Sequence, residues 1–583
     1  MFERLRPLNP YLRRYWKSLA WGGVAVIIYN LSKVLMPLVI GHAIDDMRHG
    51  VTKQKIVFHS LRLLAVAIVA AIFLYINRQV IIGASREIEF DLRNDLFANL
   101  ERQSTGFYHT HRTGDIMART TNDLAAVRQL LGPAIMYSAN TIVFTAAALP
   151  FMIRISPWLT FWAFGPLPIA SVLVQYFGAR IHTRFERIQA MFSDISSKAQ
   201  ENFSGARLIR AFAQEDAEMA SFETANQEYI RRSLLLVRLM AMLWPTLEFV
   251  LGLSLMITLL VGGPQVVAHR ISVGQFTSFF VYMVQLTWPM IAIGWVVNLF
   301  QRGTASVVRI DELLKQKPEI ADDPALISKT EQPFSGAVTL RNLTFAFPDG
   351  PDVLKDINLE IPAGTSLAIV GPTGSGKSTL VNLIPRMLDA AAGSVLIDDQ
   401  PIRQIPLGTL RNNIGFVPQE TFLFSETIRQ NISFGVPKAT DADVHEAATV
   451  AHIATEILEF PKGFDTMVGE RGLTLSGGQK QRTAIARAVI RNPRILILDD
   501  ALASVDTFTE EQILSGLRRV MQGRTTIFIS HRISTARNAD QIAVLVAGRI
   551  AERGTHDELI ARNGYYTSLY EKQRLEEEIA VTT

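Results

Sequence analysis

The sequence of 583 residues contains no cysteine and few charged residues. Without cysteine, disulfide bonds, thiolate zinc sites and thiol catalysis are all excluded. Charged residues make up 19% of the chain and hydrophobic residues 48%. The mean hydropathy of +0.19 is high for a soluble protein and low for one wholly embedded in lipid, so we expect a membrane part joined to a soluble part.

The net charge of +4 is small, and we interpret it as basic loops facing anionic lipid rather than a nucleic-acid surface. No stretch resembles a cleaved signal peptide, because the basic N-terminal segment leads directly into an apolar run. Six apolar runs follow, each of the length of about 20 residues that a bilayer requires. They lie at residues 18–41, 63–85, 130–153, 156–178, 239–261 and 271–300.

Basic residues flank these runs unevenly. They cluster before the first run and in the long segments after the second and fourth, whereas the link between the fifth and sixth holds only Arg270. Since Lys and Arg stay cytoplasmic, we expect both termini inside. The two long segments are predicted to be helical arms with turns near 107–123 and 201–215. From periodicity alone, an ordinary solvated hairpin explains them equally well.

The sequence pattern changes near residue 336. From there on, short β-branched runs alternate with helical stretches. This pattern is typical of an α/β domain with a largely parallel sheet. The predicted fold is therefore an α-helical six-span transmembrane domain fused to an α/β domain. We place the transmembrane domain at residues 1–317, a linker at 318–335 and the α/β domain at 336–583.

A glycine-rich loop, GPTGSGKSTL, follows the strand TSLAIV. Its glycines let backbone N–H groups wrap phosphates, Lys377 adds a point charge, and Ser378 offers a hydroxyl to Mg²⁺. Asp499, at the end of ILILDD, should reach the same Mg²⁺ through water; an isolated aspartate there would more simply cap a helix. This pattern is typical of the P-loop of an α/β P-loop domain, and the residues expected to bind a nucleotide there are Gly371, Thr373, Gly374, Ser375, Gly376, Lys377, Ser378 and Thr379.

Between these motifs stands LTLSGGQKQRTAIARAVI. With this segment the chain resembles the ATP-binding cassette of an ABC transporter, whose signature is LSGGQ. The resemblance implies that Ser476, Gly477, Gly478 and Gln479 cover the γ-phosphate of ATP held by a second cassette. ATP, Mg²⁺ and a second ABC half-transporter are therefore the expected cofactors and partner.

Further positions match the motifs of this family in order. Gln419 resembles the Q-loop glutamine, which contacts Mg²⁺ and the membrane arms, and His531 resembles the switch histidine at the γ-phosphate. Phe347 occupies the place of the aromatic residue that stacks on adenine. Other matched positions are Ser504, Val505 and Asp506 of the D-loop, Gly469, Glu470 and Arg471 before the signature, and the arm segments TGDIMAR and GARLIRAF with Glu215. Six spans ahead of one cassette resemble the half-transporter of a type IV ABC exporter.

Asp500 departs from the family pattern, which usually has glutamate there to orient the attacking water. Aspartate is one methylene shorter, so its carboxylate falls about 1 Å short, a misplacement that can cost on the order of a hundredfold in rate. The resemblance therefore implies the weak half of a heterodimeric exporter. A homodimer with a small backbone adjustment remains the alternative, because Gln419 and His531 are retained.

The predicted function is ATP-driven export of hydrophobic or amphipathic compounds, of multidrug or lipid type, across a bacterial inner membrane. The alternatives are a homodimeric lipid flippase and an ATP-dependent regulator of another membrane protein; a nucleic-acid partner is not expected. Glu248, the acid inside the fifth run, either attracts a cationic substrate or pairs with a neighbouring helix. Further residues expected to line the cavity or to serve helix packing are Asn140, Gln175, Gln285, Trp288 and Asn298.

Overall fold

The computed structural model describes residues 2–325, 334–348, 350–469, 472, 474–502 and 507–582. The chain divides into two compact units. The first comprises Met1–Glu101 and Arg112–Gln316, and the second comprises Arg102–His111 and Lys317–Thr583. The linker expected at 318–335 falls within the range of the second unit, and its residues 326–333 lie outside the described residues.

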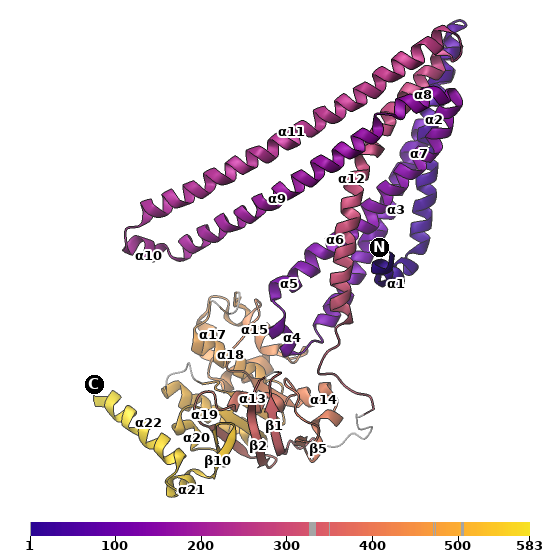
Figure 1. The fold of residues 1–583 in the computed structure, drawn as a ribbon. Helices are drawn as coiled ribbons and strands as arrows, with labels where there is room; N and C mark the ends of the chain where they lie inside the picture. Colours follow the sequence, from indigo (N-terminus) through magenta and orange to yellow (C-terminus); the bar gives the residue numbers. More distant parts are fainter. Residues whose placement is uncertain are drawn as a thin grey trace. The chain divides into compact units, whose positions relative to one another are not determined.

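The first unit is built of helices (Figure 1). Among the described residues, six helices are long and apolar enough to cross a membrane, and each contains one predicted run, apart from one residue at the start of the fourth run and two at the start of the sixth. They are Trp16–Arg48 (α2), Lys53–Leu100 (α3), Thr113–Ile155 (α5 to α7), Pro157–Ser204 (α8 and α9), Glu215–Val267 (α11) and Val273–Lys315 (α12). The six-span prediction is therefore confirmed.

Shorter elements complete this unit. Before the first span lie a 3-10 helix at Phe2–Leu8 and α1 at Asn9–Arg14. The component helices of the third and fourth spans are α5 (Thr113–Ala118), α6 (Leu124–Gln129), α7 (Ile135–Ile155), α8 (Pro157–Phe164) and α9 (Leu167–Ser204). π-helical turns at Arg119–Asp123 and Leu130–Ala134 separate α5, α6 and α7, and the second contains Pro133, which lacks an N–H for the α-helical ladder.

A buried carboxylate ties the third span to the sixth. Asp123, in the first π-helical turn, is 8% exposed. It accepts hydrogen bonds from Ser306 Oγ (2.8 Å) and Arg309 Nε (2.8 Å), both on α12. Charge-assisted bonds of this kind compensate the burial of the carboxylate, so the turn is held at a fixed position on α12.

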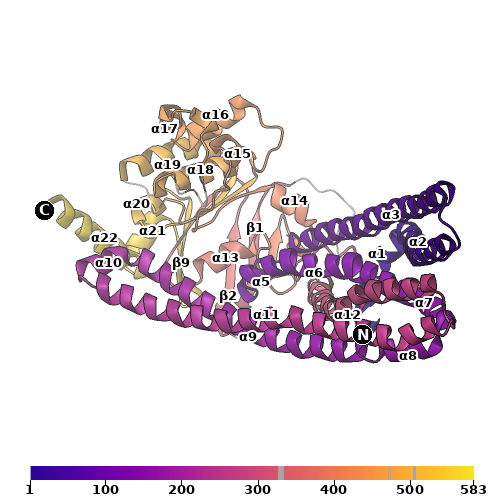
Figure 2. The same ribbon diagram turned by 90° about the horizontal axis from the view of Figure 1, so that it is seen from above.

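The second arm is a long helical hairpin. α9 and α11 run side by side and are joined at the tip by α10 (Ala206–Ala211) (Figures 1 and 2). No residue of α10 is buried within the described chain. The large apolar side chains of Phe203, Leu208 and Phe212 are 81%, 64% and 68% exposed, so the tip presents an apolar surface.

The second unit contains two sheets. A six-stranded sheet has the order β10-β9-β3-β8-β7-β6, with parallel pairing except between β9 and β10. Its strands are β3 (Ser366–Val370), β6 (Ile414–Val417), β7 (Ile495–Asp499), β8 (Thr525–Ile529), β9 (Gln541–Val546) and β10 (Arg549–Gly554). A four-stranded antiparallel sheet has the order β2-β1-β4-β5, from β1 (Val338–Ala346), β2 (Asp352–Ile361), β4 (Val395–Ile397) and β5 (Gln400–Pro401).

One apolar core lies between the two sheets, and a second joins the six-stranded sheet to helices. Strands β3, β7 and β8 are buried at every residue, which is why they form continuous apolar runs in the sequence.

The helices of the second unit that follow β3 are α13 (Lys377–Leu383), α14 (Leu407–Asn412), α15 (Ile428–Ser433), α16 (Asp441–Val450), α17 (Ala454–Glu459), α18 (Gly477–Val489), α19 (Thr507–Met521), α20 (Ile533–Ala536), α21 (His556–Ala561) and α22 (Tyr565–Thr582). Short 3-10 turns lie at Ile402–Gln404 and Gly463–Asp465.

The tip of the first arm packs with this second unit, although the sequence placed it in the transmembrane domain. It carries α4 (Thr105–Thr110), and α4 belongs to the unit that contains the sheets. Ser104 Oγ donates to Glu319 Oε2 at 2.9 Å, and Thr105 Oγ1 donates to the Met387 carbonyl at 3.3 Å. Phe107 is 6% exposed. The arm tip is therefore anchored by both hydrogen bonds and apolar burial.

Candidate functional site

The loop between β3 and α13 forms a backbone cradle. Gly371 has φ 148°, and a Cβ placed there would lie 2.1 Å from the carbonyl oxygen of Leu545. Gly376 has φ 100° and precedes α13 in the left-handed region. A side chain is excluded at Gly371 and strained at Gly376, so the loop can follow a path that turns its N–H groups toward a ligand.

Lys377 begins α13 with its amine folded back onto the loop. Its Nζ donates to the carbonyl oxygens of Gly371 and Pro372, each at 2.9 Å. Burial lowers the pKa of the Lys377 amine, while the charges of Asp500 and Asp499 oppose that shift. A partly desolvated ammonium group in the cradle is well placed to meet a phosphate.

Ser378 and Asp499 join the loop to the neighbouring strand. Ser378 Oγ donates to Asp499 Oδ1 at 3.0 Å, and Asp499, the last residue of β7, is 3% exposed. Burial raises the pKa of the Asp499 carboxyl, and the hydrogen bond from Ser378 partly offsets that shift. A hydroxyl and a carboxylate oxygen side by side are the kind of ligands that Mg²⁺ prefers.

These residues fit a nucleotide and its magnesium ion. Ser375 Oγ is buried and has no hydrogen-bond partner among the described residues, so the loop keeps an unused donor. Thr373 and Gly374 are exposed at the rim of the loop, and Thr379 is half-buried on α13. The cradle and the lysine would hold phosphates, and the paired serine and aspartate would face Mg²⁺. When bound, Mg²⁺ neutralises phosphate charge.

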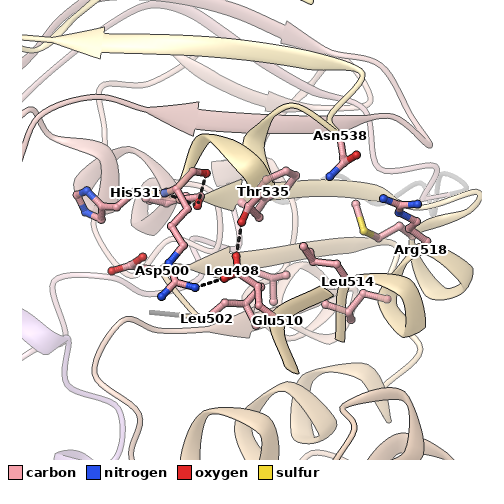
Figure 3. A pocket seen from close by; sticks show the side chains of 16 residues that line it. Leu498, Asp500, Leu502, Glu510, Leu514, Arg518, His531, Thr535 and Asn538 are labelled. Carbon is pink, nitrogen blue, oxygen red and sulfur yellow. Dashed lines mark hydrogen bonds and ion pairs between the residues drawn. The ribbon is translucent and has the colours of Figure 1, made fainter. Parts of the chain in front are cut away.

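Asp500 and His531, which follow β7 and β8, are among the residues that line one cavity of about 290 Å³ and lie at its edge (Figure 3). Asp500 has φ 49°, a left-handed conformation that is strained for a residue with a side chain. Its N–H donates to the Ile529 carbonyl at 3.2 Å, which fixes the turn against β8. The remaining wall is largely apolar, with Leu498, Leu502 and Leu514 among its residues. The strained turn therefore places the Asp500 carboxylate beside the end of β8.

The loop that carries His531 is held by side chains from two helices. Gln573 on α22 donates from Nε2 to the His531 carbonyl (2.5 Å) and accepts at Oε1 from the Ile533 N–H (2.8 Å). The buried Glu510 on α19 accepts hydrogen bonds from Arg532 and Thr535. Sequence reasoning missed Gln573 and Glu510, because each acts on a loop more than 20 residues away and no local motif marks it.

The signature segment begins α18. Ser476 Oγ accepts from the Gln479 N–H at 3.2 Å, and Gln479 Oε1 accepts from the Ser476 N–H at 2.9 Å, a reciprocal capping box. The Gln479 amide also donates to Glu456 at 3.0 Å. Because these side chains are fixed, the N–H groups of Gly477 and Gly478 at the helix start remain for another partner.

The structure brings together the glycine-rich loop, Asp499, Asp500 and His531. No hydrogen bond or ion pair of the described residues joins this group to 476–479. Gln419 is exposed just after β6. Phe347 follows β1, is 45% exposed and meets Phe345 edge to face at 5.2 Å. Residues predicted to contribute that lie outside the described residues are Glu470, Arg471, Ser504, Val505 and Asp506.

A P-loop unit joined to six membrane-length helices defines the class of ATPase-coupled membrane transporters. Residues 19–290 match the family model for the ABC transporter transmembrane region, and residues 354–503 match the model for the ABC transporter itself. The chain belongs to the ABC transporter family and is an ABC-type transporter ATPase.

Its relatives match along nearly the whole chain. A probable multidrug resistance ABC transporter ATP-binding/permease protein, YheI of Bacillus subtilis (strain 168), is 36% identical over 99% of this chain and 98% of its own. An ATP-dependent lipid A-core flippase of Syntrophus aciditrophicus (strain SB) is 35% identical over 99% of this chain and 95% of its own length. The solved structure of a bacterial Atm1-family ABC exporter with ATP bound shares the fold, with a TM-score of 0.77 and 29% sequence identity. The match covers 97% of this chain and 99% of that chain.

Proposed function

We propose that this chain is half of an exporter that uses ATP to move hydrophobic or amphipathic compounds across the cytoplasmic membrane. The observation that carries the proposal is the packing of Arg102–His111 within the unit that holds the nucleotide-site residues. This segment lies between α3 and α5, so a movement of that unit acts directly on two membrane-length helices. The multidrug and lipid A-core relatives support export as the direction and amphipathic compounds as the substrates.

Each site residue has a role in this proposal. Residues 371–379 and Phe347 bind ATP, and Ser378, Gln419 and Asp499 face Mg²⁺, the last through water. Asp500 orients the attacking water, His531 contacts the γ-phosphate, and Asp506, which lies outside the described residues, acts as a further catalytic residue. Residues 476–479 cover the nucleotide of a second chain. This agrees with the hydrogen bonds of the described residues, none of which joins 476–479 to the glycine-rich loop of the same chain.

A second chain is also supported by the tip of the second arm. Its apolar side chains Phe203, Leu208 and Phe212 are exposed and lie on the cytoplasmic arm predicted from the basic residues around it. Exposed apolar residues at the end of a long hairpin are typical of a docking contact. We propose that this tip docks on the cassette of the partner.

Asp500 supports a heterodimer in which this site binds ATP and hydrolyses it slowly. The experiment is ATP turnover and molecular mass of this chain purified alone in lipid nanodiscs. A monomer, or a dimer that binds ATP with little turnover, is the expected result. Robust turnover by a dimer would instead identify a homodimer in which Asp500 is competent.

Transport itself is tested in inside-out membrane vesicles that contain the assembled complex. We expect ATP-dependent accumulation of a fluorescent amphipathic dye, lost with Lys377→Ala and kept with Lys462→Ala, a change at an exposed lysine of the same unit. Lys377→Ala should weaken ATP binding because it removes the amine from the cradle. Accumulation that continues without ATP would refute the proposal.

A further inference from the structure

A cavity with two cationic residues lies inside the first unit. It has a volume of about 140 Å³ and is lined by residues of α2, α3, α7 and α12. Its charged lining residues are Lys33 on α2 and Arg78 on α3. Both belong to membrane-length helices and to the apolar runs 18–41 and 63–85, so both charges lie within predicted spans.

Neither cation has an acidic counterpart in the part of the chain that the structure describes. No acidic residue lines the cavity, and no ion pair involves Lys33 or Arg78. Lys33 Nζ lies 4.7 Å from the centroid of the Phe144 ring, a contact that offsets only part of the cost of an ammonium group in hydrocarbon. The cavity therefore lacks a counterion.

The asparagines beside these cations are already oriented. Asn30 Nδ2 donates to Asn140 Oδ1 at 2.7 Å, and Asn77 Nδ2 reaches the same oxygen at 3.5 Å. Asn30 and Asn77 are 1% and 0% exposed, so this cluster is fixed by packing. Because the Asn140 oxygen accepts, its NH₂ group is left as a donor at the cavity wall. A fixed amide donor next to two cations is typical of an anion site.

The rest of the wall suits an apolar body. Tyr29, Tyr137, Phe144 and Trp288 line the same cavity. We propose that the cavity binds the anionic head, a phosphate or carboxylate group, of an amphipathic substrate whose apolar part lies along these aromatic rings. The inference rests on the export function proposed above and names its substrate class. Glu248, considered from the sequence as a site for a cationic substrate, is exposed on α11 and does not line this cavity.

The test uses the full chain in phosphatidylcholine nanodiscs and radiolabelled dodecyl phosphate, measured by scintillation proximity against empty nanodiscs. Dodecyltrimethylammonium, with the same tail and opposite charge, and inorganic phosphate, without a tail, serve as competitors. We expect Lys33→Met and Arg78→Met each to weaken the affinity for dodecyl phosphate about tenfold. Lys33→Arg should keep it within about threefold, and Arg154→Gln, a cation on α7 outside the cavity, should leave it unchanged.

Equal affinity of the wild type and the Lys33→Met/Arg78→Met double variant would overturn the inference. Displacement by dodecyltrimethylammonium as effective as by unlabelled dodecyl phosphate would also overturn it, and equal displacement by inorganic phosphate would show a site for a free anion instead. Lys33→Arg keeps the charge, so it separates a charge effect from a folding defect. Binding is measured without ATP, so a failure of ATP-dependent transport counts against the proposed export function and not against this site.

Discussion

Gln573 holds the loop of His531 through the backbone on both sides of Arg532. Its amide donates to the His531 carbonyl at 2.5 Å and accepts from the Ile533 N–H at 2.8 Å. An amide that uses its donor and its acceptor on one loop fixes both the position and the direction of that loop. The end of the chain therefore sets the conformation of the residue proposed to contact the γ-phosphate.

Gln573→Ala should lower the residual ATP turnover of this chain, purified alone in lipid nanodiscs, about fivefold to tenfold while the KM for ATP changes little, because the glycine-rich loop is untouched. Gln573→Glu keeps the acceptor for Ile533 and loses the donor to His531, so an intermediate loss is expected. The measurement is steady-state ATP turnover over a range of ATP concentrations. Glu571→Ala, at an exposed position of α22, is the matched control, and equal kinetics for the Gln573→Ala and Glu571→Ala variants would contradict the prediction.

Asp499→Asn should stabilise the nucleotide-free protein and abolish its response to magnesium. Burial raises the pKa of Asp499 in the folded state, so this carboxyl contributes stability at low pH that is lost as the pH rises through the raised pKa. At neutral pH the buried charge is therefore a cost, which the neutral amide removes. Without nucleotide, we expect the melting temperature of the Asp499→Asn variant to lie above that of the wild type. The difference should be about 2–4 °C for each kcal/mol by which the free energy of unfolding increases.

The measurement for Asp499→Asn is thermal unfolding of the full chain in nanodiscs, with and without ATP and Mg²⁺. The wild type should be stabilised more by ATP with Mg²⁺ than by ATP alone, and the variant should lose that difference. Asp352→Asn, at an exposed position on β2, should behave as the wild type. A variant that still responds to Mg²⁺ would show that Asp499 does not face the ion.

Ser476→Arg should stop turnover of the whole complex while ATP binding at the glycine-rich loop of this chain stays intact. The change removes the hydroxyl that caps α18, a loss of about 1 kcal/mol in stability, and places a long cation where the partner's nucleotide is proposed to dock. Ser476→Thr keeps a capping hydroxyl and should retain most activity. The pair is compared by ATP turnover and by nucleotide binding, and retained turnover in the Ser476→Arg variant would refute a role in the second site.

Phe107→Ala should separate ATP use from transport. The ring is 6% exposed and stacks on His111 at 4.2 Å between centroids, so its loss leaves a void under the arm tip. We expect ATP-dependent accumulation of dye in vesicles to fall at least about tenfold, with ATP affinity unchanged within about twofold. His109→Ala, at an exposed position of the same helix, is the control, and parallel loss in both variants would contradict the prediction.

Features that depend on neighbouring residues were predictable from the sequence. The six spans follow from apolar length, and the cap of α18 follows from Ser476 and Gln479, which stand three residues apart. The positive φ angles of Gly371 and Gly376 follow from a glycine-rich loop between a buried strand and a helix. In each case the interacting groups lie within one element or one turn of it.

Features made by distant parts of the chain were not predictable in this way. The arm tip at Ser104 and Thr105 packs on Glu319 and Met387, which are 215 and 282 residues further along the chain. Lys33 and Arg78 are single charges in two apolar runs, and only the contact of α2 with α3 shows that they share a cavity. A pattern in one segment carries no information on which face meets another segment.

The polypeptide passes between the two units at three places, after Glu101, after His111 and after Gln316. A single connection lets one body rotate about it, and each further connection removes part of that freedom. A cut between α3 and α4 would leave the two units covalently joined after His111 and after Gln316, yet the path from α4 to α3 would be broken. The covalent connection of the two units and the mechanical path from α4 to α3 are therefore separate properties of this chain, and a nicked protein whose fragments stay associated need not remain able to transport.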